Sequence, residues 1–171
     1  MVKKIMHDPL FLAQKSVDAT EADKQIVTDL LDTLRANLEH CVGMAANMIG
    51  EKKNIIVVAA GPFQFAMINP VITKKSGAYQ TEEGCLSLPG FSEEIVRPVK
   101  VSVSALDENG KPFVIEDADG LLGRCIQHEN DHLDGILYID HGDEAYKQEV
   151  IETMHRRAER AAKKAAAKEA K

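Results

Sequence analysis

The sequence contains no tryptophan, and aromatic residues make up only 5% of its 171 residues. Proteins that bind single-stranded nucleic acid present several aromatic faces along a basic groove, so this composition argues against such a surface. No apolar run approaches the ~20 residues that a membrane span needs. The charged segment from Met1 to Pro9 also lacks the apolar stretch of a signal peptide. We therefore expect a cytoplasmic protein that binds neither DNA nor a membrane.

Cysteine is scarce as well, with three residues in a chain that carries no export signal. An odd number of cysteines does not suggest a disulfide framework, and cytoplasmic thiols stay reduced and able to bind a metal. The length indicates one domain, and a hydrophobic content of 44% is enough for a sizeable core. We expect a monomer.

Positive charge is rare in most of the chain and concentrated at its end. The net charge is −6, which argues against broad phosphate binding. Residues 156–171 nevertheless hold seven basic residues against two acidic ones, a local charge of +5 that leaves −11 for the rest. This asymmetry divides the chain into a body of residues 1–155 and a basic helical tail of residues 156–171.

Apolar spacing predicts three helices. Thr20 and Asp23 form a capping pattern before leucines at helical spacing, which indicates an amphipathic helix over about residues 21–39. A second helix is expected over about 120–134, with Asp119 as its cap and Gly135 as its stop signal. The Ala-, Lys- and Glu-rich segment from about residue 143 predicts a long exposed helix.

The middle of the chain has the pattern of a sheet. Short apolar or alternating runs are separated by Gly, Pro and Asn-Gly turn signals. Short connections favour antiparallel or mixed pairing, so the expected fold class is α+β, with sheets packed around the helix over residues 120–134 and a helix near each end. The predicted strands cover residues 54–60, 65–69, 99–106 and 113–115.

The helix over residues 120–134 carries a pattern with chemical meaning. His128 and His132 are separated by four residues, so both imidazoles lie on one helix face and can bind one cation. Glu129 lies about 100° further round the helix, where it can act on water without being a ligand. The alternative is a helix with two surface histidines.

A catalytic metal site usually needs a third protein ligand. A histidine six residues after His132 would indicate one class of metallopeptidase, but that position is Tyr138. A downstream glutamate, Glu149 or Glu152, would indicate another HExxH metallopeptidase class. The remaining source lies upstream, at Cys85.

Three motifs resemble those of the peptide deformylase family, in the family's order. Residues 127–135, QHENDHLDG, resemble the signature QHExDHLxG, and residues 83–87 match the family's EGCLS. Residues 41–48, CVGMAANM, resemble a variant of its first motif, GφGφAAxQ. The resemblance covers roughly residues 5–155.

The resemblance implies the roles of the site residues. It implies that Cys85, His128 and His132 bind the metal, that Glu129 is the catalytic acid/base, and that backbone groups of Gly43 and Leu86 hold and polarise the substrate. It further implies Fe²⁺ as the native metal, with Zn²⁺, Ni²⁺ or Co²⁺ able to replace it, and N-formyl-Met nascent polypeptides as the substrate. In bacterial members of the family a C-terminal helix contacts the ribosome, so the basic tail has two interpretations: it binds ribosomal RNA through phosphate contacts, or it is a solvated Ala/Lys helix.

The first motif departs from the family pattern at two positions, Cys41 for glycine and Met48 for glutamine. The family's glutamine donates a hydrogen bond to the developing oxyanion, whereas a thioether cannot donate. Asn47 is a possible substitute, but in an extended segment it would face the opposite side. A low-activity, peptide-binding relative of the deformylases is therefore the alternative function. Cys41 and Cys125 are expected to be small core residues, although Cys125 could line the substrate pocket.

Overall fold

The strands form two antiparallel sheets in the computed structural model, which describes residues 1–171. The larger sheet has the order β1-β2-β3-β6-β7, and the smaller one is the hairpin β4-β5. The expected α+β class is confirmed. The strands are β1 Gly43–Ala45, β2 Ile55–Ala60, β3 Phe63–Ser76, β4 Tyr79–Cys85, β5 Leu88–Arg97, β6 Lys100–Leu106 and β7 Pro112–Ala118.

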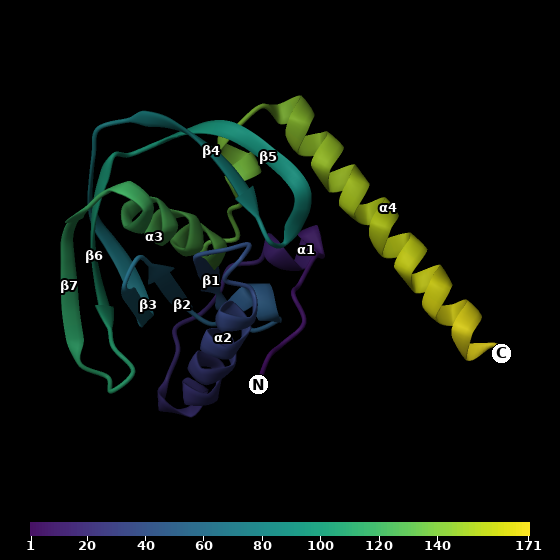
Figure 1. Cartoon of the computed structure of the whole chain (residues 1–171), viewed down its shortest axis with the longest axis horizontal. Coiled ribbons are helices and arrows are strands. Elements are labelled where there is room, and N and C mark those ends of the chain that lie inside the picture. The colour runs from purple at the N-terminus through teal and green to yellow at the C-terminus, as the bar shows by residue number, and fades with distance from the viewer.

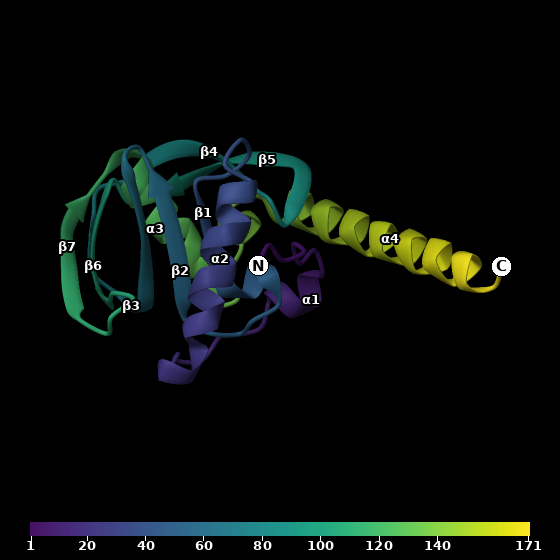
Figure 2. The ribbon, with the colours of Figure 1, turned by 60° about the horizontal axis from the view of Figure 1, so that its bottom comes forward.

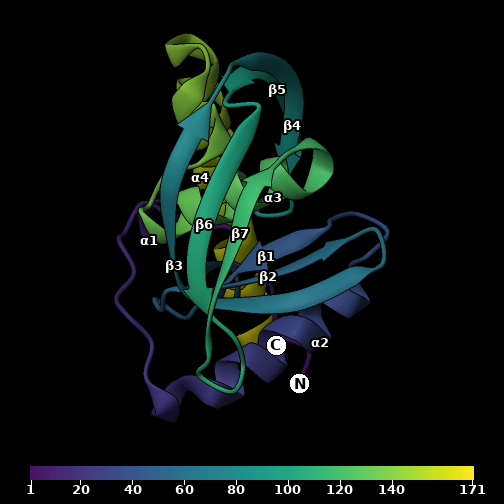
Figure 3. The same cartoon turned by 90° about the vertical axis from the view of Figure 1, so that its left-hand side faces the viewer.

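The helix α3 runs through the middle of the molecule, enclosed by the strands (Figure 1). Figure 3 shows the β4-β5 hairpin on one side of α3 and β1-β2 on the other, whereas α2 lies on the outside of β1 and β2 (Figure 2). The helices are α1 Pro9–Leu12, α2 Lys24–Ala36, α3 Gly120–Leu133 and α4 Glu144–Glu169, with the short 3-10 helices η1 Glu21–Asp23, η2 Ala46–Ile49 and η3 Tyr138–His141.

The predicted helices occur, with corrected ends. The first begins as η1, where Thr20 and Asp23 form the expected capping box, but α2 ends at Ala36 and leaves Leu38 exposed. Asp119 precedes α3 with an extended backbone, but its side chain makes no capping hydrogen bond, so that detail was wrong. Gly135 follows α3 with φ 73°, a left-handed conformation that ends a helix and favours glycine.

Two differences concern the strands. The segment predicted as 65–69 belongs to β3, which continues through Pro70 by means of a register shift between Ile68 and Val71. The β4-β5 hairpin was not predicted. Its buried positions include the polar residues Thr81 and Glu83, so it lacks the apolar alternation of a half-buried strand.

The apolar interior consists of two clusters. The larger lies between α2, α3 and the five-stranded sheet, and includes Leu30, Val57 and Ile126. The smaller joins β5, η3 and α4 through residues such as Leu88 and Met154. Cys85 packs against both clusters, so the end of β4 lies where the two meet.

The helix α4 extends away from the rest of the molecule (Figure 1). Only Val150 and Met154 are buried, and every residue after His155 is exposed. The helix is continuous from Glu144 to Glu169, so a boundary after residue 155 would fall inside one helix. No helix in the structure is both long and apolar enough to cross a membrane.

Candidate metal centre and active site

Helix α3 and the end of strand β4 bring Cys85, His128 and His132 together. One potential ligand atom from each residue lies within 4.8 Å of the others, and Cys85 Sγ is 3.4 Å from His132 Nε2. Spacing of four residues on α3 accounts for the two histidines. Glu149 and Glu152, the alternative third ligands, lie on α4 and do not belong to this group.

The position of Cys85 depends on a register shift in the hairpin. Pairing runs regularly from Tyr79 to Gly84, and then Cys85 pairs with Leu88 across a tight turn. His7 Nδ1 lies 3.0 Å from the carbonyl oxygen of Ser87 within this turn. The Cys85 sulfur therefore lies at the end of β4, and the turn that follows it is contacted by His7 from outside the hairpin.

A chain of charged groups orients the His128 ring. Its Nδ1 lies 2.8 Å from Glu83 Oε1, and Arg97 forms a two-point ion pair with the Glu83 carboxylate. Arg97 also bonds Asp131 at 2.9 Å. Because Nδ1 is engaged, Nε2 is the nitrogen that remains for a cation.

The same contacts set the ionisation of Glu83. Burial alone would raise its pKa, but hydrogen bonds from His128 and Arg97 outweigh burial and lower the pKa to about 2. Glu83 is therefore a carboxylate at neutral pH, compensated on both sides.

Glu129 occupies a contrasting environment. Its side chain is buried, and its Oε2 has no hydrogen-bond partner. Its Oε1 lies 4.0 Å from His128 Nε2. Burial raises the pKa of this carboxyl to about 7, a value suited to exchanging protons near neutral pH.

The donor set fits a transition-metal ion. A thiol and two imidazoles are ligands that Zn²⁺ and Fe²⁺ accept in proteins. His132 is fully buried, and burial lowers its pKa well below the ordinary value, which favours the neutral ring that a metal binds. The structure therefore offers a three-residue metal site with an unpartnered carboxyl oxygen nearby.

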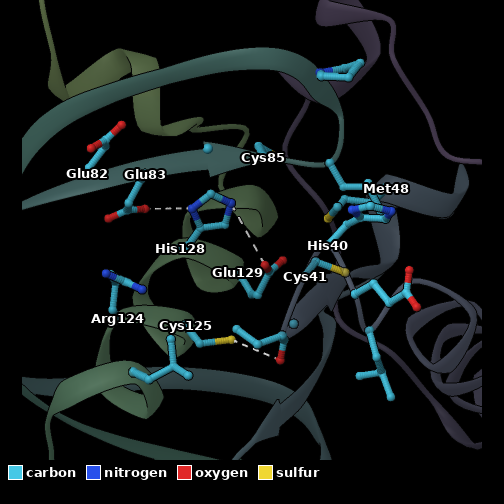
Figure 4. A pocket seen from close by; sticks show the side chains of 18 of the residues that line it. His40, Cys41, Met48, Glu82, Glu83, Cys85, Arg124, Cys125, His128 and Glu129 are labelled. Atoms are coloured by element: carbon cyan, nitrogen blue, oxygen red, sulfur yellow. Dashed lines mark hydrogen bonds and ion pairs between the residues drawn. The ribbon is translucent and has the colours of Figure 1, made fainter.

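A cavity of about 750 Å³ opens onto these residues. Its wall contains Cys85, His128, Glu129 and Cys125, and Figure 4 shows His128 between Glu83 on one side and Glu129 on the other. Gly43 lines the same cavity. Helix α3 approaches its backbone so closely that a Cβ at Gly43 would clash with Cys125 Sγ and lie 3.1 Å from Glu129 Cγ. The expectation that Cys125 lines the pocket is confirmed, and Leu86 lines it too.

Met48 also lines the cavity, whereas Asn47 does not. The Met48 sulfur accepts from the Ala45 amide at 3.5 Å. The Asn47 amide donates to the carbonyl oxygen of His132 at 2.9 Å, so it cannot replace the missing glutamine. Asn47 was expected to face away from the site because an extended segment would turn it to the opposite side. It does face away, but the segment is the 3-10 helix η2, so the geometric reason was wrong.

Sequence reasoning did not single out Arg97, Asp131 or the role of Glu83. A buried acid in β4 and a buried arginine in β5 lie 14 positions apart, and nothing local in the sequence links them. The one available signal was the place of Glu83 at the start of the EGCLS motif, two residues before Cys85.

An α+β fold in which a His-Glu-x-x-His helix and an adjacent cysteine line one cavity defines a class of metal-dependent hydrolases. The chain belongs to the polypeptide deformylase family, whose sequence profile matches residues 2–148. It is 52% identical to a peptide deformylase of Clostridium beijerinckii over 139 residues, 80% of this chain and 99% of the relative. It is 46% identical to peptide deformylase 1 of Clostridium perfringens over 126 residues, 72% of this chain and 84% of that protein.

Solved structures agree with the sequence comparison. The crystal structure of peptide deformylase from Ehrlichia chaffeensis superposes with a TM-score of 0.84 at 30% identity, over 95% of this chain and 99% of the other. The same enzyme in complex with actinonin gives a TM-score of 0.82 at 32% identity, over 91% and 97%.

Proposed function

We propose that this chain removes the N-formyl group from the N-terminal methionine of newly synthesised proteins and releases formate. Membership of the deformylase family supports this hydrolase function over a metallopeptidase or a purely peptide-binding role. The observation that carries the proposal is the buried Glu129 carboxyl, which has an unpartnered oxygen and whose Oε1 lies 4.0 Å from Nε2 of His128 in the Cys85, His128 and His132 site. A protein that only binds peptides has no need of such a base.

Cys85, His128 and His132 are assigned as the metal ligands, with Fe²⁺ as the native ion and Zn²⁺, Ni²⁺ or Co²⁺ as replacements. When bound there, the metal supplies Lewis-acid chemistry, polarising a carbonyl oxygen and making water more acidic. Glu83 and Arg97 orient His128 for this task. Their ion pair fixes which ring nitrogen faces the site.

Glu129 is assigned as the acid/base. Its carboxyl group, with Oε1 on the side of His128 Nε2, accepts a proton from the attacking water as the water oxygen bonds to the formyl carbon. The same carboxyl then delivers that proton to the methionine nitrogen as the carbon–nitrogen bond breaks. The products are a free amino terminus and formic acid, which gives up the second proton of the water when it ionises to formate.

Gly43 and Leu86 are assigned to substrate binding through their backbone groups. Both lie in the cavity wall, Gly43 on β1 and Leu86 directly after Cys85. Gly43 can approach a peptide closely because it has no side chain. The extended space beyond them can receive the residues that follow methionine.

Formate release from a formyl-Met-Ala-Ser peptide by the Ni²⁺- or Fe²⁺-loaded protein tests the proposal. We expect turnover with the metal and none after chelation, with activity restored when the metal is added back. Loaded protein that binds the peptide without releasing formate would support the alternative of a peptide-binding relative.

We further propose that the protein works as a cytoplasmic monomer and that the exposed tail of α4 contacts ribosomal RNA. The basic side chains after Arg157 are exposed and can neutralise phosphates, although the body is acidic. Co-sedimentation with ribosomes tests this by comparing the natural chain with a variant in which Arg160, Lys163, Lys164 and Lys168 are alanine. Equal pelleting of the two proteins would contradict it.

A further inference from the structure

Helix α4 is attached to the hairpin strand that borders the cavity. The Tyr146 hydroxyl donates to the carbonyl oxygen of Ser92 at 2.8 Å, and its ring packs edge-on against Phe91 at 6.2 Å. Met154 is buried in the smaller apolar cluster with residues of β5. The first half of α4 is therefore part of the body, although the family profile ends at residue 148.

Arg157 makes the last of these attachments. Its Nη1 donates to the carbonyl oxygen of Pro89 at 2.8 Å, and its guanidinium lies 5.3 Å from the centre of the Phe91 ring. Arg157 has no carboxylate partner within ion-pair distance. Among the basic residues after His155, it is the one with a hydrogen bond to the body.

The residues that Arg157 holds belong to the cavity wall. Pro89 and Gly90 both line the cavity, four and five residues after Cys85. Gly90 has φ 85°, in the left-handed region that glycine adopts without strain, so the backbone of this stretch turns at a residue with no side chain to anchor it. Two contacts reach this stretch from outside the hairpin: His7 at Ser87 on one side and Arg157 at Pro89 on the other.

We propose that Arg157 is a positioning residue for substrate binding, which holds the Pro89–Gly90 wall so that the cavity keeps the shape that receives the peptide portion of the substrate. The proposal rests on the proposed deformylase function only for what the cavity binds. Arg157 touches neither the metal ligands nor Glu129, so its loss should change substrate affinity and leave the chemical step intact.

Arg156 provides a matched control. It precedes Arg157 directly, carries the same charge, and bonds only Thr153 of its own helix, at 3.1 Å. Arg156→Ala and Arg157→Ala therefore remove the same charge from the tail, but only the second releases the cavity wall. Arg157→Lys can restore the hydrogen bond to Pro89 without the planar stacking on Phe91.

The experiment compares full-length wild type, Arg156→Ala, Arg157→Ala and Arg157→Lys. For the Ni²⁺-loaded proteins acting on formyl-Met-Ala-Ser, we expect Arg157→Ala to raise KM roughly three- to tenfold with kcat within about twofold, as loss of a charged hydrogen bond and a cation–π contact implies. Arg156→Ala should match wild type, and Arg157→Lys should fall between. Equal KM for the two alanine variants would overturn the proposal.

Hydrogen exchange separates this proposal from the deformylase function itself. The amides of Leu88, Gly90 and Phe91 should exchange faster in Arg157→Ala than in Arg156→Ala, whether or not the protein turns over substrate. Unchanged exchange there would also overturn the proposal. Absence of turnover in wild type would contradict only the proposed function.

Discussion

Glu83 and Glu129 are two buried carboxyls on opposite sides of His128, and their surroundings differ in kind. Glu83 faces the hairpin side, where Arg97 and His128 satisfy its oxygens and lower its pKa to about 2. Glu129 faces the side of β1 and η2, where Cys125, Gly43 and Met48 offer no strong donor, and burial raises its pKa to about 7.

The difference shows how one fold gives two carboxyls different tasks. A fully paired carboxylate fixes geometry, because moving it breaks several charged contacts. An unpaired one retains a free oxygen and a pKa near neutrality, which proton transfer requires. Each of the following changes alters the surroundings or the ionisation of one of these two carboxyls, and the expected effects decrease in order.

Replacing the unpaired carboxyl should have the largest effect. Glu129→Gln keeps the shape of the side chain but removes the proton acceptor, so we expect kcat to fall about 10²–10⁴-fold. Metal content, measured by atomic absorption, should stay at the wild-type level because Glu129 is not a ligand. A variant that retains more than a tenth of the activity would show that another group moves the proton.

Removing the guanidinium group of Arg97, which pairs with Glu83, should lower the free energy of unfolding. Arg97→Met leaves Glu83 and Asp131 without their shared partner, and breaking a buried ion pair in this way costs about 3–5 kcal/mol. Urea unfolding of the metal-free protein measures the change. Arg35→Met is the control, because the exposed Arg35–Asp32 pair should contribute less than ~1 kcal/mol; equal losses would contradict the contrast between buried and exposed pairs.

Adding a hydrogen-bond donor at Met48, on the Glu129 side of the cavity, should increase kcat. Met48→Gln places an amide donor in the cavity wall, and an oxyanion donor is typically worth about 10²–10³-fold in rate. We expect kcat to rise, by less than this range if the amide is imperfectly placed. Met48→Leu, which adds no donor, should leave kcat near wild type, and an unchanged Met48→Gln would show that another group already stabilises the oxyanion.

Filling the close approach at Gly43 should destabilise the protein moderately. The added methyl group of Gly43→Ala would meet Cys125 Sγ, and overpacking of this kind costs about 1–3 kcal/mol. Thermal unfolding measures the loss. Combining it with Cys125→Ala removes the clashing sulfur and should recover part of the stability; no recovery would mean that the Val57 carbonyl, 3.2 Å from the added atom, is the limiting contact.

The two carboxyls should also act in opposite directions on pH-dependent stability. In the metal-free protein the raised pKa of Glu129 means that stability falls as pH rises from about 4.5 to about 7, by at most about 1.4 kcal/mol per pH unit. The lowered pKa of Glu83 means that stability is lost as pH falls from about 4.5 towards 2. Urea titrations should show that the free energy of unfolding of Glu129→Gln changes less between pH 4.5 and 7 than that of the wild type. An identical slope for the two proteins would contradict the raised pKa of Glu129.

Periodicity in the sequence predicted the elements whose apolar side faces a core. Helix α3, with Ile126 and Leu133 buried, and strand β6, with Val101 and Val103 buried, follow this rule. The hairpin β4-β5 does not, because it buries Glu83 and Arg97 against each other. Burial by mutual charge compensation depends on contacts between distant segments, which no local pattern records.

The site was predictable to the extent that its motifs are contiguous. His128, Glu129 and His132 follow from helix geometry, whereas Cys85 joined them through a motif resemblance and not through spacing. The hydrogen bond from the Asn47 amide to the His132 carbonyl, 85 positions away, could not be predicted without the folded structure. Nor could the attachment of Arg157 to Pro89.

The straightness of α4 has a consequence for how the protein would search for substrate. From Ala158 to Glu169 the helix makes no contact that bends it back, and at 1.5 Å per residue this length is about 18 Å. A surface bound by the last turns would be held at a fixed distance from the cavity by a stiff spacer. Substrate presented near that surface would then meet the cavity at a high effective concentration, so weak affinity for free peptide need not limit the rate.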